Sequence, residues 1–287
     1  MVSYIYPDDL KEALKIRSEQ AVIPLAGGTD LMVRYENWSS LPPSFPGDIM
    51  GISHLKELKE IRQEDDWLSI GSGVTLDCII ASPEVPDLLR RGVEEIAAPA
   101  VRNLATLAGN IANSSPAADS LPPLFVMDAS LCLISVRGER IIPVRDFITG
   151  PGKNDLQSDE LIKSILIPMA FIREEKNGQS FYRKVGTRKA NALSKLSYCG
   201  WALTEDSNLK DIRIAAGAVG PVVVRLPEEE DKLKGCRLRE LSAKWSAVRG
   251  AYEKNITPID DQRSTANYRK RTAMKLLDHM ISELSDW

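Results

Sequence analysis

The order of apolar and polar positions predicts a β-α-β unit at the start of the chain. Residues 2–6 form a short β-like run, and a helix follows in which Leu10, Leu14 and the stem of Arg17 share one face. The apolar run at residues 21–25 predicts a second strand. Because crossovers of this kind are right-handed, the end of that strand is expected at a carboxyl edge of the sheet.

Two adjacent glycines, Gly27 and Gly28, interrupt the second strand within the stretch I-P-L-A-G-G-T-D-L. Glycine adopts positive φ and has no Cβ, so backbone N–H groups around such a turn can converge on a bound group. Thr29 and Asp30 are good N-cap residues for a helix predicted over residues 31–38, and helix starts attract anions. The pattern therefore favours a phosphate ligand, although it is also common in ordinary tight turns.

Proline-rich and charged segments divide the rest of the chain. Three prolines within residues 39–47 predict a linker, and the alternating strand L-I-K-S-I-L-I-P closes the next region. The last third has strand-like runs and then two helices, over residues 238–254 and 267–284, the second with an apolar stripe expected in a domain core. An α+β fold is predicted, with units at residues 1–47, 48–172 and 176–287.

Residues 101–124 are unusually rich in small and amide side chains. Such a run can bring backbone close to a bulky polar ligand, with Thr106, Asn110 and Asn113 among its donors and acceptors. The alternative is a long surface loop, and composition leaves both interpretations open. Loops of this length without secondary structure are uncommon unless they are functional. A helix is expected to follow over residues 121–127.

Composition excludes several classes of protein. The 287 residues carry a formal charge of −3 and a pI near 5.7, so no broad basic surface predicts a nucleic-acid partner. No apolar run approaches the ~20 residues of a membrane span, and the first residues have neither the basic nor the apolar region of an export signal. The cytoplasm is the expected location.

Cysteine and histidine are too scattered to form a metal site. The chain has four cysteines without a C-x-x-C pair, and two histidines. This argues against zinc or an iron–sulfur cluster held by this chain alone. The sequence also lacks G-x-S-x-G, H-E-x-x-H and a phosphate loop that ends in Gly-Lys-Ser/Thr. No catalytic residue and no metal ligand is predicted.

Five stretches, taken in order, resemble one family. They are L-A-G-G-T-D-L at position 25, I-G-S-G-V-T-L at 70, V-R-N-L-A-T-L-A-G-N-I-A-N-S-S-P-A-A-D-S-L-P-P-L at 101, F-I-T-G-P-G-K at 147 and F-Y-R-K-V-G-T-R at 181. The match covers nearly the whole chain, and the pair N-x-x-T-x-x-G-N and P-A-A-D-S is specific. The chain resembles the flavin subunit of molybdenum hydroxylases of the xanthine dehydrogenase and carbon monoxide dehydrogenase type.

The resemblance implies a two-subdomain FAD-binding domain (PCMH-like) followed by a C-terminal α/β domain. In that family the FAD pyrophosphate lies between two glycine-bearing loops, whose N–H donors bind a doubly charged group with few cationic side chains. The positions that match the family's FAD contacts are Ile23, Pro24, Leu25, Ala26, Gly27, Gly28, Thr29, Asp30, Ala105, Thr106, Leu107, Ala108, Gly109, Asn110, Asp119, Leu161 and Lys184.

One of these positions departs from the family pattern. The family usually has Gly-Gly-Asn in the second loop, and Ala108 replaces the first of these glycines. Alanine fits if its φ is negative, but costs about 1 kcal/mol or more if it is forced into the left-handed region.

The resemblance also implies a role in electron transfer. A molybdenum cofactor on a large partner subunit would hydroxylate the substrate, [2Fe-2S] clusters on a small partner would carry electrons, and FAD on this chain would reduce an acceptor, with NAD expected. The G-P-G-K and P-A-A-D-S stretches look closest to purine-oxidising bacterial members, which favours a xanthine or hypoxanthine dehydrogenase heterotrimer. The alternatives are a carbon monoxide, nicotinate or aromatic-substrate dehydrogenase with a quinone or ferredoxin acceptor, or a scaffold subunit that has lost FAD.

Overall fold

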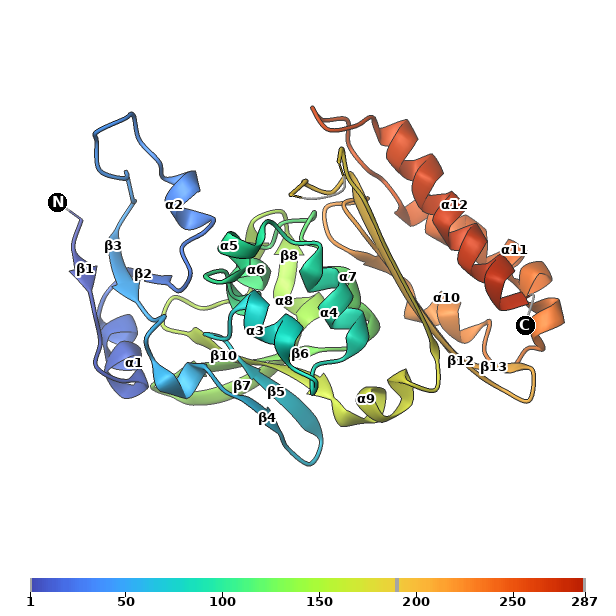
Figure 1. The fold of residues 1–287 in the computed structure, drawn as a ribbon, viewed down its shortest axis with the longest axis horizontal. Helices are drawn as coiled ribbons and strands as arrows, with labels where there is room; N and C mark the ends of the chain where they lie inside the picture. Colours follow the sequence, from blue (N-terminus) through green and yellow to red (C-terminus); the bar gives the residue numbers. More distant parts are fainter. Residues whose placement is uncertain (1, 189–190, 286–287) are drawn as a thin grey trace.

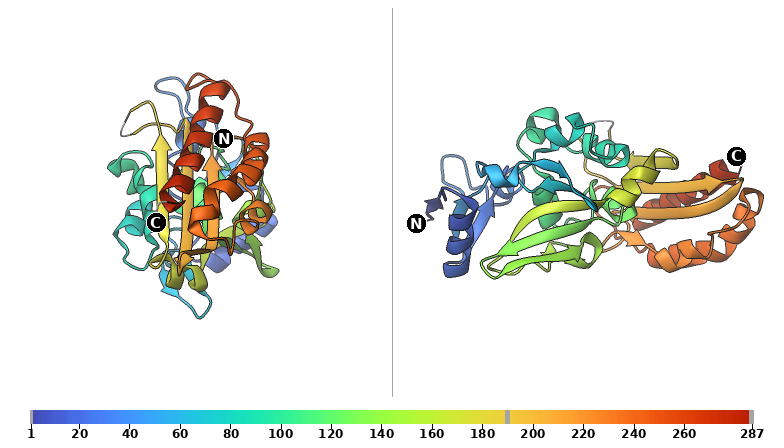
Figure 2. Two further views of the ribbon diagram at one scale, coloured as in Figure 1. Left: turned by 90° about the vertical axis from the view of Figure 1, so that its right-hand side faces the viewer. Right: turned by 90° about the horizontal axis from the view of Figure 1, so that it is seen from below.

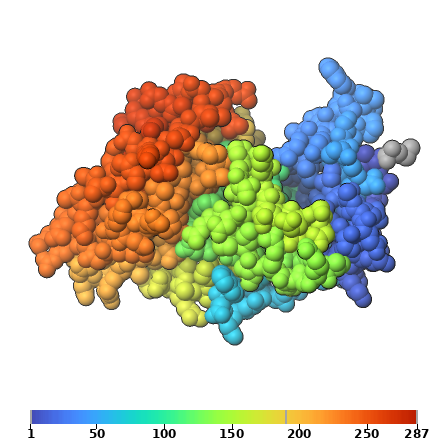
Figure 3. All heavy atoms as spheres, turned by 180° about the vertical axis from the view of Figure 1, so that it is seen from behind, coloured from blue at the N-terminus to red at the C-terminus, as the bar shows by residue number. Residues whose placement is uncertain are grey.

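Three α/β units lie in a row along the long axis of the molecule (Figures 1 and 2). The computed structural model describes residues 2–188 and 191–285. Seen from behind, the same three units appear as blue, green and orange blocks of the surface (Figure 3). The predicted α+β architecture, with two N-terminal subdomains and a C-terminal α/β domain, is confirmed.

The first unit is a three-stranded parallel sheet in the order β1-β3-β2. Its elements are β1 (Tyr4–Ile5), α1 (Leu10–Glu19), β2 (Val22–Leu25), α2 (Leu31–Arg34) and β3 (Asp48–Gly51). Helix α1 begins at Asp9, whose carboxylate accepts the N–H of Glu12, and it packs Ala13 and Leu14 into the core. The predicted β-α-β unit is therefore present.

Strand β3 lies beyond residue 47, where the first unit was expected to end. It pairs with both β1 and β2, and is the central strand of their sheet. A division at residue 47 therefore separates one strand from its two partners. We propose the boundary after Leu58, because the buried Leu55 and Leu58 still belong to the core of the first sheet.

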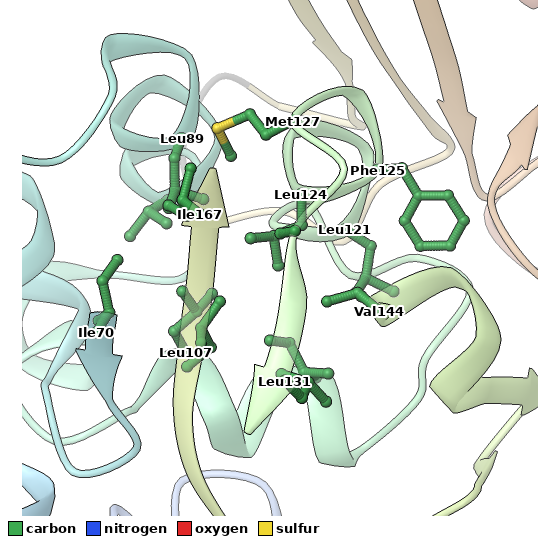
Figure 4. Packing of buried hydrophobic residues seen from close by; sticks show 14 of the residues in the cluster. Ile70, Leu89, Leu107, Leu121, Leu124, Phe125, Met127, Leu131, Val144 and Ile167 are labelled. Carbon is green, nitrogen blue, oxygen red and sulfur yellow. The ribbon is translucent and has the colours of Figure 1, made fainter. Parts of the chain in front are cut away.

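The second unit is a five-stranded antiparallel sheet in the order β4-β5-β10-β6-β7. The helices α3, α4, α6 and α7 cover one face, and the largest apolar core lies between them and the sheet (Figure 4). The short helix η1 (Lys56–Leu58) lies on the first unit's side of the proposed boundary. The elements of the second unit are β4 (Ile61–Gln63), β5 (Trp67–Gly71), α3 (Leu76–Ala81), α4 (Asp87–Glu94), α5 (Pro99–Arg102), α6 (Leu107–Ala112), α7 (Leu121–Val126), β6 (Ser130–Ser135), β7 (Gly138–Pro143), α8 (Val144–Phe147), β8 (Ile148–Gly150), β9 (Lys153–Asn154), β10 (Leu161–Pro168) and α9 (Met169–Glu175).

The third unit is a four-stranded antiparallel sheet in the order β11-β12-β13-β14. Two long helices, α11 and α12, cover one face of it (Figure 1). The predicted apolar stripe of the last helix is confirmed as core, since Leu277 and Ile281 are buried there. The elements are β11 (Gln179–Val185), β12 (Leu196–Glu205), β13 (Asn208–Gly217), β14 (Val224–Arg225), α10 (Pro227–Asp231), α11 (Leu238–Asn255) and α12 (Ala266–Ser285).

One predicted helix is shorter than expected, and residues 101–124 contain more helix than expected. The helix predicted over residues 31–38 ends at Arg34, where its backbone leaves the helical conformation at Tyr35. Residues 101–124 are not a long loop, because they contain α6 and the start of α7. Among the described residues, no helix is both long and apolar enough to cross a membrane.

Candidate functional site

The two glycine-bearing loops predicted from the sequence lie against each other. We call residues 26–30 the first loop and residues 104–110 the second loop. Gly27 has no room for a side chain, because a Cβ there would overlap the carbonyl oxygen of Leu104 and approach Ala105 Cα to 3.0 Å. The absent side chain of Gly27 therefore allows the two loops to approach each other, and is not itself the space for a ligand.

The first loop has unused hydrogen-bond donors. The backbone N–H groups of Gly27, Gly28, Thr29 and Asp30 donate to no acceptor within residues 2–188 and 191–285. Gly28 has φ +69°, the left-handed conformation that glycine adopts without strain. Successive N–H groups in such a turn form a concave surface for an anion.

The ends of the first loop are held in different ways. Ile23, Pro24 and Leu25 belong to β2 and are half-buried, as are Ala26 and the two glycines. Asp30 is the N-cap of α2, but its carboxylate caps no N–H group and instead pairs with Arg34 Nη2 at 2.8 Å. Asp30 thus occupies the predicted N-cap position, while its carboxylate is used in an i,i+4 ion pair.

The second loop is the start of helix α6. Thr106 is the N-cap, and its hydroxyl accepts the N–H of Gly109 at 3.1 Å. Leu107 lies in the core with Ile70 and Leu131 (Figure 4), so it presents only backbone to a ligand. The Asn110 side-chain oxygen accepts the Ser120 hydroxyl at 2.6 Å. In the described part of the chain the Asn110 amide NH₂ has no acceptor and is available to a ligand.

Ala108 is not strained. It lies in the first turn of α6, outside the set of residues with positive φ, and its side chain is buried in the core. The cost of a left-handed alanine therefore does not arise at this position. The replacement of the family's usual glycine gives no structural reason for the loss of FAD.

Asp119 and Lys184, both predicted as FAD contacts, form an ion pair with each other. Lys184 Nζ lies 2.8 Å from Asp119 Oδ2, and the two side chains are 6% and 7% exposed. Lys184 also donates to the Glu95 carbonyl at 2.6 Å, and the Ser194 hydroxyl donates to Asp119. Burial raises the pKa of Asp119, while Lys184 and Ser194 act in the opposite direction. The pair joins the start of α7 to the C-terminal sheet.

Leu161 lies apart from these polar groups. It is 2% exposed and packs in the core of the first sheet, with Leu14 and Val22. The structure thus brings the first and second loops together, and links Asp119 to the second loop through Ser120 and Asn110. Contact of Leu161 with a flavin stays a prediction.

A polar cavity of about 400 Å³ lies between α7 and the C-terminal sheet, and is separate from the two loops. Its arginines are already paired with carboxylates, as Arg225 lies 2.7 Å and Arg213 3.2 Å from Asp128. Arg225 also pairs with Glu230 at 3.2 Å. This cavity is therefore an interdomain ion-pair network and no ready site for an anion.

Leu104 was not recognised in the sequence. Its carbonyl packs on Gly27, while its side chain is 60% exposed beside the first loop. No sequence signal identifies it, because an isolated leucine within V-R-N-L-A-T is also expected in a core.

The fit of the loops to FAD rests on the unused donors of Gly27 to Asp30 and Asn110, which suit an acidic, multiply charged group.

Two family models together match nearly the whole chain. The FAD binding domain in molybdopterin dehydrogenase matches residues 1–170, and the CO dehydrogenase flavoprotein C-terminal domain matches residues 181–284. The fold and the paired glycine loops are those of a flavin-binding protein class. The chain belongs to the family of molybdopterin dehydrogenase FAD-binding domains, as an oxidoreductase flavoprotein subunit of the molybdenum hydroxylases.

Curated relatives and solved structures agree with this family. The chain is 28% identical over 264 residues to the xanthine dehydrogenase FAD-binding subunit of Escherichia coli O157:H7, covering 90% of this chain and 87% of that one. It is 28% identical over 246 residues to the nicotinate dehydrogenase FAD-subunit of Eubacterium barkeri, covering 82% and 80%. A structure of reconstituted CO dehydrogenase from Oligotropha carboxidovorans superposes with a TM-score of 0.87 at 21% identity, covering 100% and 98%.

Proposed function

We propose that this chain binds FAD between its first and second loops, and serves as the electron-transfer subunit of a molybdenum hydroxylase. One observation carries the proposal most directly. Gly27 packs on Leu104 in a chain that belongs to an FAD-binding family, so two loops with unused donors lie side by side. When bound, FAD supplies the redox chemistry that links one-electron iron–sulfur clusters to a two-electron acceptor such as NAD.

The residues of this chain bind and orient the cofactor. The N–H groups of residues 27–30 and the Asn110 amide would hold the pyrophosphate, with no cationic side chain required. Asp119, next to Ser120 in the same hydrogen-bonded segment, is the acidic group proposed to accept hydroxyl groups of the cofactor. The Lys184 ammonium pairs with the Asp119 carboxyl, opposes the rise that burial causes in its pKa and holds it in place. Leu161 is retained as a proposed apolar contact.

The partners follow from the family. We propose a heterotrimer in which a small subunit holds [2Fe-2S] clusters and a large subunit holds the molybdenum cofactor. The similarity to a xanthine dehydrogenase subunit supports xanthine as the substrate of the complex. We propose hypoxanthine as a second purine substrate and NAD as the acceptor.

A second candidate substrate has comparable support. The nicotinate dehydrogenase FAD-subunit is 28% identical to this chain, the same value as for the xanthine dehydrogenase subunit. A nicotinate-oxidising complex is therefore the alternative. The organic substrate binds the partner that holds molybdenum, so no residue of this chain selects between the two.

Activity of the purified complex distinguishes the two substrates. The complex should be isolated with its partner subunits and supplied with hypoxanthine, xanthine, nicotinate and carbon monoxide, each with NAD. We expect NADH formation with the purines alone. Turnover with nicotinate and none with purines would assign the complex to the second candidate, and a folded complex without flavin would contradict the proposed role of this chain.

A further inference from the structure

Arg17 is a buried cation at the boundary between the first and second sheets, which we call the seam. It lies on α1 and is 9% exposed. Its Nη1 donates to the carbonyl of Val22 at 2.6 Å, while Nε and Nη2 donate to the carbonyl of Glu160 at 3.3 and 3.1 Å. Val22 begins β2, and Glu160 directly precedes β10. One guanidinium therefore binds the main chains of both sheets.

This arginine is poorly explained by the stability of α1 alone. Among the described residues no carboxylate lies within ion-pair distance of Arg17, and burial lowers its pKa although the charge of Asp159 raises it. Burying a charge without an ion pair is costly. An apolar side chain would fill the same space at lower cost. What the guanidinium adds to the apolar cluster of Val22 and Leu161 is a direct hydrogen-bonded link between the two carbonyls.

The Glu160 carbonyl is itself held firmly. The Glu160 carboxylate pairs with Arg140 at 2.6 and 2.8 Å, and also accepts the N–H of Gln157 at 2.9 Å. Arg17 thus connects β2 to a fixed point in the second sheet, and not to a mobile turn. Strand β2 leads directly into the first loop, so its placement determines where that loop lies.

The two loops and Arg17 lie at different places along the seam. The Arg34 end of α2 bonds to Asn113 at the end of α6, whereas α1 packs against β6. At the loops, the two sides are joined by the contact of Gly27 with Leu104 and by a 3.3 Å hydrogen bond from Arg34 to Asn113. Arg34 is exposed in this bond, so it contributes little rigidity.

We propose that Arg17 is a positioning residue for the flavin. Arg17 fixes the position of the Val22 carbonyl relative to the Glu160 carbonyl. It thereby sets the separation of the first and second loops without touching the cofactor. The inference rests on the proposed function, since it concerns the same site. Without Arg17 the first sheet rotates relative to the second about the apolar contact of Leu161 with Leu14 and Val22. The hydrogen-bond donors of the two loops then no longer converge.

FAD affinity is the first test. Wild type, Arg17→Met and Arg17→Lys are titrated with FAD, with Arg62→Met as the control, because Arg62 is exposed and pairs with the exposed Glu60. Arg17→Met should raise the FAD dissociation constant about tenfold or more, with Arg17→Lys between it and wild type and the control unchanged. A folded Arg17→Met protein that binds FAD like wild type overturns the proposal.

A distance measurement gives a second readout that loss of stability alone does not change. Nitroxide labels are placed at Met32→Cys and Asn103→Cys, which are exposed positions on the two sides, with the exposed Cys78 changed to Ser. Arg17→Met should broaden the distribution of label distances in the apo protein, and FAD should narrow it. Identical distributions with and without Arg17 contradict the proposal.

The two proposals fail in different ways. If the wild type binds no FAD, the proposed function is wrong, and the label distances in the apo protein alone decide whether Arg17 sets the loop separation. If Arg17→Met does not fold, Arg17→Lys decides the question. An Arg17→Lys protein with wild-type affinity and wild-type distances overturns the role of Arg17.

Discussion

Gly27 and Leu104 are in direct backbone contact, and this contact joins the two loops of the proposed FAD site. A Cβ on Gly27 would overlap the Leu104 carbonyl. Gly28, its neighbour, is required for a different reason, because it has φ +69° and a Cβ there would approach only the Met32 and Leu25 side chains, with Met32 Cγ at 3.3 Å. The two adjacent glycines therefore support separate predictions.

Gly27→Ala should separate the loops. The overlap with Leu104 forces backbone movement, and we expect the free energy of unfolding to fall by about 1–3 kcal/mol, with FAD lost at micromolar concentrations. Urea unfolding and FAD titration measure the two effects. Gly250→Ala is the matched control, because Gly250 is an exposed position of α11 where a Cβ meets nothing within 4 Å. FAD binding unchanged in Gly27→Ala would mean that loop contact is not needed.

Gly28→Val should remove FAD while leaving the fold. Valine in the left-handed region costs about 1–2 kcal/mol, and relief of that strain turns the N–H groups of the loop away from one another. Gly235→Val in the C-terminal domain carries the same strain at φ +74° in open space. Both variants should lose similar stability, and Gly28→Val alone should lose flavin. Stoichiometric flavin in Gly28→Val would show that the first loop is misassigned.

Ala108→Gly should not improve FAD binding. Ala108 lies in α6 with its side chain in the core, so the family's usual glycine would lower stability by about 0.5–1 kcal/mol. Calorimetric FAD titration should give a dissociation constant within about twofold of wild type. A much tighter complex in Ala108→Gly would show that alanine disturbs the second loop.

Lys184→Met should destabilise the protein increasingly as pH rises. The Asp119 carboxyl would lose the ammonium that opposes its burial, so its folded pKa would rise further above the ordinary 3.8. The folded state then binds more protons than the unfolded state above pH 3.8, and stability falls with pH until Asp119 ionises in the folded protein. The full loss is about 3–5 kcal/mol.

Urea unfolding at a series of pH values measures this dependence. The double variant Lys184→Met/Asp119→Leu should regain most of the lost stability, because it leaves no unpaired buried charge. Glu95, which also faces Asp119, remains unchanged in both variants. A loss of stability in Lys184→Met that does not vary with pH would argue against a buried ion pair.

The sequence predicted those parts of the fold that depend on local patterns. The glycine turn after β2 follows from an apolar run ending at Gly27, and the apolar stripe of α12 follows from helical spacing. Helix α6 was missed because its residues, L-A-G-N-I-A, have little amphipathic contrast. Placement of β3 between β1 and β2 was missed because strand order in a parallel sheet is not encoded locally.

The sequence predicted the separate segments of the candidate site, but not the residue contacts between them. Two loops that face each other were expected, and the first and second loops lie against each other at Gly27 and Leu104. The packing of Gly27 on Leu104, the pairing of Lys184 with Asp119 and the bonds of Arg17 to Glu160 all join residues far apart in the chain. Such contacts depend on tertiary structure, so they cannot be predicted from the spacing of motifs along the chain. The FAD contacts themselves stay a prediction.

The visible spectrum of the isolated chain, after reconstitution with FAD and removal of excess cofactor, tests the central claim most directly. Circular dichroism on the same sample establishes that the protein is folded. We expect flavin absorption at one FAD per chain, lost in Gly28→Val and retained in Gly235→Val. A folded wild-type chain without flavin absorption would contradict the assignment of the two loops as an FAD site.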